Sequence, residues 1–336
     1  MAVYDFNETP VFYADIKDID IRPEGPFCMS FGYESGALIR SIEATGLINP
    51  PVLLERENSK FIIVTGFRRI LAARSLGWKQ IACRALSESR VSPLQCLIMN
   101  LHDNLATREI NNVEKGMVLS RLSSYLSTEE MVSRYLPLLG LSRSRSVLDF
   151  FIRLEKCLDT ESKEYLVKGL ISLDTAKSLI DMDSGTRSMV TDIITNLKLS
   201  INYQRQLIEL IDDISLKKGI SPYMVLRKKE VLEVVSDARL NRSQKVKALF
   251  DILRKERFPT LIQAERAFKD MVSRLALPKG MKIFAPQYFE APDYSLHVIF
   301  RNGRDLKKKI EILSGKKELM DLSYPWEEGA SCPDQN

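Results

Sequence analysis

The chain contains few of the residues from which metal centres and disulfide frameworks are built. It has only two histidines, His102 and His297, and five cysteines among its 336 residues. The cysteines are scattered, and no two of them have Cys-x-x-Cys spacing: Cys28, Cys83, Cys96, Cys157 and Cys332. This argues against a zinc module, a disulfide framework and histidine-based catalysis, and it fits a reducing cytoplasm.

Long apolar runs are also lacking. No stretch approaches the length of a membrane-spanning helix, and the opening residues, MAVYDFNETP, lack the basic segment and apolar core of an export signal. We therefore expect neither export nor membrane insertion, and no membrane partner.

The composition is that of an ordinary globular protein, with 45% hydrophobic and 28% charged residues. The length allows about two or three domains, each with its own core. The net charge of +5 and the pI of about 8.8 suit a nucleic-acid partner without requiring one.

The most informative stretch is FIIVTGFRRILAARSLGW, from Phe61 to Trp78. Its first four residues are apolar and β-branched enough to predict a buried strand, and Thr65-Gly66 interrupts them. A helical pattern follows and stops at Gly77. A helix that begins with Arg68-Arg69 after a glycine turn is a candidate anion site, because its first backbone N–H groups are free. A solvated arginine pair on a helix shoulder is the alternative.

Similar patterns predict a compact α/β unit that ends near residue 90. Residues 1–26 are expected to be irregular, with a short strand around Ile16–Ile21. A helix is predicted from near Ser35 to Gly46, and further strands are predicted at Val52–Leu54 and Ile81–Leu86.

From Ser92 the hydrophobic period becomes helical. The first helix is expected to end at His102-Asp103-Asn104, the next to begin with a capping box at Asn111 and Glu114, and another with one at Ser127–Glu130. Val118, Leu122 and Tyr125 form the predicted buried stripe of the second of these helices.

A candidate helix-turn-helix follows, in which Gly140 lies in the turn and LSRSRSVLDFFIRLEK forms the second helix. Val147, Phe151, Leu154 and Leu158 have the spacing of a core-facing stripe. The expected DNA-binding residues are at the exposed end: Ser142, Arg143, Ser144, Arg145 and Ser146. Arginines there could contact guanine edges and serines could bind phosphates, although an ordinary helical hairpin has the same spacing.

Helices are predicted to continue to about residue 276, including a long basic helix that begins at Ser221-Pro222. The charged tracts at 226–230 and 307–312 are typical of solvated helix faces and are weaker candidates for phosphate contact. Period-two patterns at Met281–Phe284 and Leu296–Phe300, followed by a helix through Leu313, indicate a small ββα unit. Such a unit can hardly bury a core alone, so we expect it to pair with a second copy.

In this order the parts resemble the ParB-like chromosome and plasmid partition family, over about residues 14–216 and, in a dimerisation tail, 281–313. The family motifs correspond here to Gly46-Leu47-Ile48-Asn49-Pro50, Gly66-Phe67-Arg68-Arg69, Asp103-Asn104-Leu105-Ala106-Thr107 and Leu141-Ser142-Arg143-Ser144. Several motifs in the right order are far more specific than any one alone.

The resemblance implies a multidomain fold: an α+β N-terminal domain of the ParB/sulfiredoxin-like type, an all-α helix-turn-helix domain and the ββα unit. The expected boundaries are a nucleotide-binding domain at 1–90, a helical DNA-binding domain at 91–216, a helical linker or extension at 217–278, a dimerisation unit at 279–322 and a loose tail at 323–336.

The resemblance also implies a CTP-gated DNA clamp that loads at a parS-like site and then slides. The implied nucleotide-binding residues are Gly46, Thr65, Gly66, Arg68, Arg69, Asp103 and Asn104, of which Asp103 and Asn104 would also hold Mg²⁺. The expected partners are double-stranded DNA, a second copy of the chain and a ParA-type ATPase. The expected location is the cytoplasm, on the nucleoid or a plasmid.

Departures from the family pattern limit these expectations. Phe67 replaces a glutamate and Thr107 replaces an arginine, although Arg108 follows directly. We therefore expect at most a slow CTPase, with no catalytic residue assigned. The basic N-terminal segment with which many members stimulate the ATPase is missing, which leaves that partner open.

Alternatives from other classes remain. One is a site-specific regulator of transcription or replication that kept the fold without using CTP. Another is a phosphotransferase or a sulfiredoxin-like reductase, but the Thr65-Gly66-Phe67 turn lacks the cysteine that a reductase needs, and a kinase would not need residues 111–216.

Overall fold

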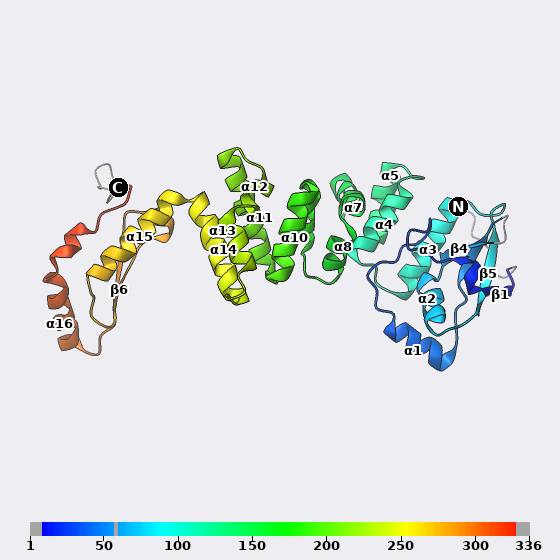
Figure 1. Cartoon of the computed structure of the whole chain (residues 1–336), viewed down its shortest axis with the longest axis horizontal. Coiled ribbons are helices and arrows are strands. Elements are labelled where there is room, and N and C mark those ends of the chain that lie inside the picture. Colours follow the sequence, from blue (N-terminus) through cyan, green and yellow to red (C-terminus); the bar gives the residue numbers. More distant parts are fainter. Residues whose placement is uncertain (1–8, 57–59, 327–336) are drawn as a thin grey trace. The chain divides into compact units, whose positions relative to one another are not determined.

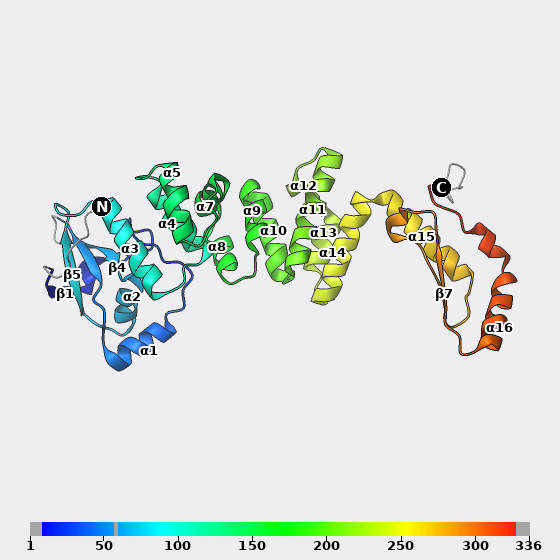
Figure 2. The ribbon, with the colours of Figure 1, turned by 180° about the vertical axis from the view of Figure 1, so that it is seen from behind.

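The computed structural model describes residues 9–56 and 60–326 (Figures 1 and 2). The chain divides into two compact units, Met1–Arg205 and Gln206–Asn336. Within the described ranges, the structure contains no helix with the length and apolar character needed to cross a bilayer. Of the predicted loose tail, residues 327–336 lie outside the described residues, as does Cys332.

The first unit begins with a five-stranded sheet in the order β1-β5-β3-β4-β2. The strands are β1 (Val11–Asp15), β2 (Ile19–Asp20), β3 (Val52–Glu55), β4 (Phe61–Thr65) and β5 (Gln80–Ser87). β3 pairs antiparallel with β4 and parallel with β5. The predicted strands at 52–54, 61–64 and 81–86 are confirmed.

The prediction for the first residues of this unit was right in part. The short strand expected around Ile16–Ile21 is present as β2, after the 3₁₀ turn η2 (Ile16–Asp18). The irregular lead-in expected before it was wrong, because Val11–Asp15 forms the edge strand β1. Val11 and Tyr13 are 47% and 72% exposed, because an edge strand shows one face to solvent. The strand therefore carries a weak hydrophobic signal.

Alternation along the strands gives the sheet two buried faces. Leu53 and Ile63 pack on one face with α2 (Phe67–Ser75), and α1 (Gly36–Thr45) packs against α2. Leu54 and Val64 pack on the other face with α3 (Pro93–Thr107). α2 and α3 lie beside the sheet in both views (Figures 1 and 2).

α3 extends further than expected. It continues past His102-Asp103-Asn104 to Thr107, and Arg108 is its C-cap. No glycine or proline stops it, and Leu105 packs against the core. Asp103 and Asn104 therefore lie in the last turns of a helix.

The rest of the first unit is helical, as predicted. Its elements are α4 (Asn112–Leu122), α5 (Thr128–Glu130), the π-helical turn η3 (Met131–Tyr135), α6 (Leu136–Leu138), α7 (Arg145–Cys157), α8 (Thr160–Val167), α9 (Leu173–Asp181), α10 (Ser184–Asn196) and the start of α11 (Ile201–Lys218). The capping box at Asn111 and Glu114 is confirmed, and Ser127 accepts a hydrogen bond from the Glu130 N–H.

α4 packs closely along α7. A Cβ atom placed on Gly116 of α4 would lie 2.8 Å from the Phe151 carbonyl oxygen of α7, closer than real Cβ contacts allow. Glycine therefore permits the two helix backbones to approach each other.

The second unit contains α12 (Pro222–Leu226), α13 (Lys229–Ser236), α14 (Arg242–Arg257), α15 (Pro259–Arg274), β6 (Met281–Phe284), η4 (Gln287–Phe289), β7 (Ser295–Val298), α16 (Gly303–Ser314) and η5 (Lys317–Asp321). β6 and β7 pair antiparallel, so the predicted ββα unit is confirmed.

The single long basic helix expected from Ser221-Pro222 was wrong, because the chain turns between α12 and α13. Val225, Leu226 and Val231 are all fully buried. In one continuous helix Val231 would point away from Val225 and Leu226, since separations of six and five residues correspond to about 1.7 and 1.4 turns. The break lets all three side chains reach the core.

Gly116→Ala is expected to lower the free energy of unfolding by about 1–2 kcal/mol, because overpacking α4 against α7 outweighs the better helix propensity of alanine. Urea unfolding followed by circular dichroism measures this. Gly36→Ala is the control, because its Cβ would meet only the flexible end of Arg40 at 3.5 Å. A Gly116→Ala protein as stable as the control would contradict the close approach.

Candidate functional site

The turn between β4 and α2 forms the base of the site. Gly66 adopts the left-handed conformation with φ 85°, and a Cβ there would lie 2.9 Å from the Pro51 Cβ. The first hydrogen bond of α2 runs from the Ile70 N–H to the Gly66 carbonyl. Gly66 has no side chain that could cap the N–H groups that precede Ile70 in the helix. The buried Thr65 and this uncapped helix start make a surface that can accept an anion.

Arg69 connects this turn to two other segments. Its Nη2 donates to Asp103 Oδ2 at 2.8 Å, and its Nη1 donates to the Asn49 carbonyl at 2.7 Å. Asn49 lies in the turn that begins at Gly46, the positive-φ residue that ends α1. Arg69, Asp103 and the Gly46 turn, predicted from separate motifs, therefore lie at one place.

Asn104 points away from this pair. Its amide donates to the Asn100 carbonyl at 2.9 Å, and its Oδ1 accepts from Arg108 Nε at 2.9 Å. In residues 9–56 and 60–326, no group of three or more histidine, cysteine or acidic side chains is placed so that it could hold a metal ion. Asp103 could supply one carboxylate to a magnesium ion, which suits an ion held mainly by phosphate oxygens; Asn104 could join only after leaving Arg108.

The centre of the site is a residue that the sequence assigned only to a helix cap. Glu114 is fully buried, and Arg68 and Arg108 approach its two carboxylate oxygens at 2.8 and 2.6 Å. The backbone N–H groups of Phe31 and Asn111 also donate to it, at 3.0 and 3.1 Å. A buried carboxylate is stable here because every oxygen is paired with a donor.

The signal for Glu114 was present in the sequence. It precedes Val118 by four residues and so lies on the stripe predicted to be buried. A charge on such a stripe needs a partner, but the partners are distant in sequence and could not be named from the pattern.

Arg68 is held on several sides. Its Nε donates to Ser30 Oγ at 2.6 Å, and its guanidinium lies 4.5 Å from the centre of the Tyr33 ring. Burial, and next the nearby Arg108 cation, lower the pKa of Arg68, while Glu114 acts in the opposite direction. Burial also raises the pKa of Tyr33. Ser30, Tyr33 and Arg108 thus belong to the site, although the sequence did not mark Ser30 or Tyr33.

Phe67, which stands where the family has glutamate, is a core residue. It is 6% exposed and packs edge-to-face with Tyr33 at a ring distance of 6.5 Å. No carboxylate is therefore available at this position. The Thr107 hydroxyl donates to the Asp103 carbonyl, and Arg108 reaches Glu114 from the next position.

The residues predicted to bind DNA gather at the start of α7. Of the predicted core-facing stripe, Phe151, Leu154 and Leu158 are buried, whereas Val147 is half-buried and its neighbour Leu148 is buried instead. The Arg145 side chain is 80% exposed and lies 3.9 Å from Asp149. The other members of the set are exposed or partly exposed: Ser142, Arg143, Ser144 and Ser146.

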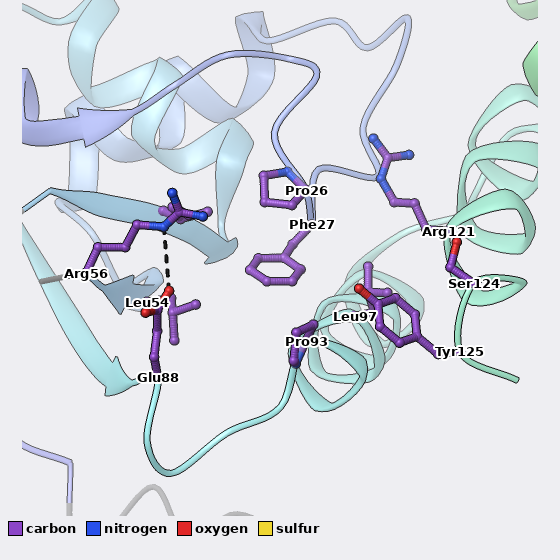
Figure 3. Close-up of a pocket in the computed structure, with 11 residues that line it drawn as sticks. Pro26, Phe27, Leu54, Arg56, Glu88, Pro93, Leu97, Arg121, Ser124 and Tyr125 are labelled. Atoms are coloured by element: carbon purple, nitrogen blue, oxygen red, sulfur yellow. Dashed lines mark ion pairs between the residues drawn. The ribbon is translucent and has the colours of Figure 1, made fainter.

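A separate cavity of about 280 Å³ lies between the sheet and the opposite end of α3 (Figure 3). Phe27, Leu54 and Leu97 form its apolar wall, and the Arg56–Glu88 ion pair at 3.5 Å borders it. None of the predicted site residues is among those that line it.

Comparison with known proteins identifies the type of the N-terminal domain. Residues 10–106 match the family model of the ParB N-terminal domain. The matched residues form a ParB N-terminal domain. This confirms the ParB resemblance for the N-terminal domain. The fold class is confirmed as an N-terminal α/β domain, a mostly helical remainder and a small C-terminal strand unit.

Curated relatives extend the similarity beyond the ParB domain. The probable chromosome-partitioning protein ParB of Campylobacter jejuni is 28% identical over 200 residues, which cover 58% of this chain and 68% of the relative. That of Vibrio cholerae is 24% identical over 219 residues, 65% of this chain and 69% of the relative. A nucleoid occlusion protein of Bacillus anthracis is 24% identical over 218 residues, 61% of this chain and 71% of the relative.

Two crystal structures of C-terminally truncated ParB from Caulobacter crescentus are also similar. One, complexed to the centromeric parS site, matches with TM-score 0.33 and 19% identity over 59% of this chain and 98% of that chain. The other, complexed with CTP-γ-S, matches with TM-score 0.26 and 20% identity over 55% of this chain and 98% of that chain.

Glu114→Gln is expected to lower the free energy of unfolding by about 3 kcal/mol, because it leaves two partly buried guanidinium groups without a counter-charge. Asp103→Asn, which removes a carboxylate that is 34% exposed, should cost only about 0–1 kcal/mol. Urea titrations of both variants test the contrast. Equal losses would mean that Glu114 is not the central charge of the site.

Proposed function

We propose that this chain is a DNA-binding partition protein whose ParB domain binds CTP with Mg²⁺ and thereby controls how the α7 region holds DNA. The observation that carries the proposal is the position of Arg68. It lies in the first turn of α2, at the anion-accepting turn, and is ion-paired with Glu114 of α4, the helix that packs on α7.

A triphosphate fits the donors at the turn. The N–H groups of the first turn of α2 and the Arg69 guanidinium lie beside Gly66, and Arg68 belongs to the same turn of the helix. Each guanidinium has donors beyond those already bonded. Asp103 can take a magnesium ion that bridges phosphate oxygens. The choice of CTP among nucleotides follows from the ParB resemblance, since no base contact is specified by these residues.

Phosphate binding would compete with Glu114 for Arg68. A triphosphate carries several negative charges, whereas Glu114 carries one and shares it with Arg108. When Arg68 turns toward phosphate, Glu114 loses part of its compensation and α4 is free to shift against α7. A nucleotide can move such an equilibrium only through this difference in contacts between the two states.

DNA binding is assigned to the exposed start of α7. Arg143 and Arg145 would contact base edges, and Ser142, Ser144 and Ser146 would contact phosphates, which is the arrangement of a recognition helix. With Phe67 in the core, no carboxylate stands beside the phosphates, so we expect slow hydrolysis or none.

A homodimer would complete the clamp through the C-terminal unit. Its β6–β7 hairpin and α16 leave large apolar side chains partly exposed: Phe284, Leu296, Ile299, Phe300, Ile310 and Ile312. Apolar groups concentrated on so small a unit are best covered by a second copy.

Arg69→Ala is expected to weaken CTP binding at least about tenfold, the loss of one charge-assisted hydrogen bond to phosphate, while affinity for bare DNA is retained. Isothermal titration calorimetry measures the affinity for CTP. Arg74→Ala is the control, because Arg74 is exposed in the last turn of the same helix.

A second readout tests the gate itself. With CTP, the wild-type protein should accumulate on closed circular DNA that carries its site and not on the linear form, and Arg69→Ala should not accumulate. If Arg69→Ala bound CTP as tightly as the wild-type protein, the proposed phosphate site would be wrong. If the protein bound its specific site equally well with and without CTP, it would be a site-specific regulator rather than a CTP-gated clamp.

Arg145→Ala is expected to weaken binding to the specific site by about 1–3 kcal/mol if it contacts a base, with little change on unrelated DNA. Arg153→Ala, further along α7 and paired with Asp181, is the matched control. The site comes from sequencing DNA that co-purifies with the cross-linked protein, and anisotropy titrations then compare the variants. An unchanged preference would place base recognition elsewhere.

A further inference from the structure

A group of basic residues gathers where three helix ends meet in the second unit. The group, here named the helix-end cluster, comprises Lys217, Lys218, Arg227, Lys228, Lys229, Arg254, Lys255 and Arg257. They come from the end of α11, the break between α12 and α13, and the end of α14. α11, α12, α13 and α14 lie side by side in both views (Figures 1 and 2).

Direct contacts hold these ends together. Lys217 Nζ donates to the Arg257 carbonyl at 3.1 Å. Lys218 and Lys228 both pair with Glu256, whose side chain is only 11% exposed. The break that separates α12 from α13 thus brings Lys228 to the end of α14, where a single long helix would have placed it elsewhere.

The positive charge exceeds what the fold needs at this place. The acidic partners inside the cluster are Glu256 and Asp213, the latter 2.8 Å from Arg257. Two helix C-termini add about half a negative charge each. Glu230 also acts on Lys228, and Lys229 lies 3.8 Å from Glu233. With both of these carboxylates counted, an excess of about three positive charges remains. Burial, and next repulsion from Lys218, lower the pKa of Lys228.

The charge of the whole chain is concentrated in the same segment. Residues 206–276 contain fifteen Lys and Arg against ten Asp and Glu, whereas the full chain contains 49 against 44. The remainder is therefore balanced, with 34 of each sign, and the net +5 belongs to this helical segment. A general need for solubility would not confine the charge to one segment.

We propose that the helix-end cluster is a second, sequence-independent DNA-binding surface that contacts the phosphate backbone of the duplex. The inference rests on the proposed function, because it takes the same DNA as the partner. The helix-end cluster lies outside the ParB domain and outside α7, so it would add to the affinity for DNA without contributing to the choice of DNA site. Most of its side chains are exposed at the ends of rigid helices, as backbone contacts require.

The test uses the full chain and a short duplex that lacks the specific site. The variant Arg227→Gln with Arg254→Gln and Lys255→Gln removes exposed members of the cluster and leaves the Glu256 pairs intact. Its affinity should fall about tenfold, and the slope of log K against log salt should become shallower by about 0.9 for each phosphate that the variant no longer neutralises.

The matched control carries the same change in charge on α15: Arg266→Gln with Lys269→Gln and Arg274→Gln, all exposed. The control should retain both the affinity and the slope. An equal loss in both variants would overturn the inference, because only total charge would then matter. Retention in both would overturn it as well.

The Arg145→Ala protein separates this proposal from the proposed function. It should lose site preference and keep the cluster-dependent binding to unrelated duplex. If the wild-type chain binds no duplex of any sequence, the proposed function fails; if it binds its site and the cluster variant is unaffected, only the second surface fails.

Discussion

The buried carboxylate of Glu114 is the charge on which the first unit depends. Two guanidinium groups and two backbone N–H groups converge on it, and they come from α2, from the residue that caps α3, from the segment before α1 and from the start of α4. In a poorly solvated place, each of these charges is tolerable only while the others are present. The ParB domain and the following helices are therefore joined by an electrostatic unit as well as by apolar packing.

Local patterns predicted much of this arrangement. The β-branched run before Thr65, the glycine that begins α2 and the capping box at Asn111 are each contained in a few adjacent residues, so their structures followed directly. The motifs also suggested which arginines would be near Asp103, and the geometry brings Arg69 there. These parts depend on short-range backbone preferences, which a sequence displays openly.

The remainder depended on contacts between distant residues. Glu114 reads as a cap within its own helix, yet Arg68, one of its main partners, is 46 residues away. The edge strand β1 has an exposed face, so its hydrophobic pattern is weak. Its strand character depends on pairing with β5, which is distant in sequence. The break after Leu226 was missed because its cause is the burial of Val231, a tertiary effect that overrides the helical pattern of the segment.

The backbone N–H of Phe31 bonds to a carboxylate, whereas most amides bond to a carbonyl group. Its proton is therefore deshielded by a full negative charge, and it exchanges with solvent only when its hydrogen bond to Glu114 breaks. In a nitrogen-15 correlation spectrum, this single resonance would act as a natural reporter of the state of the arginine network, with no added label on the side chains themselves.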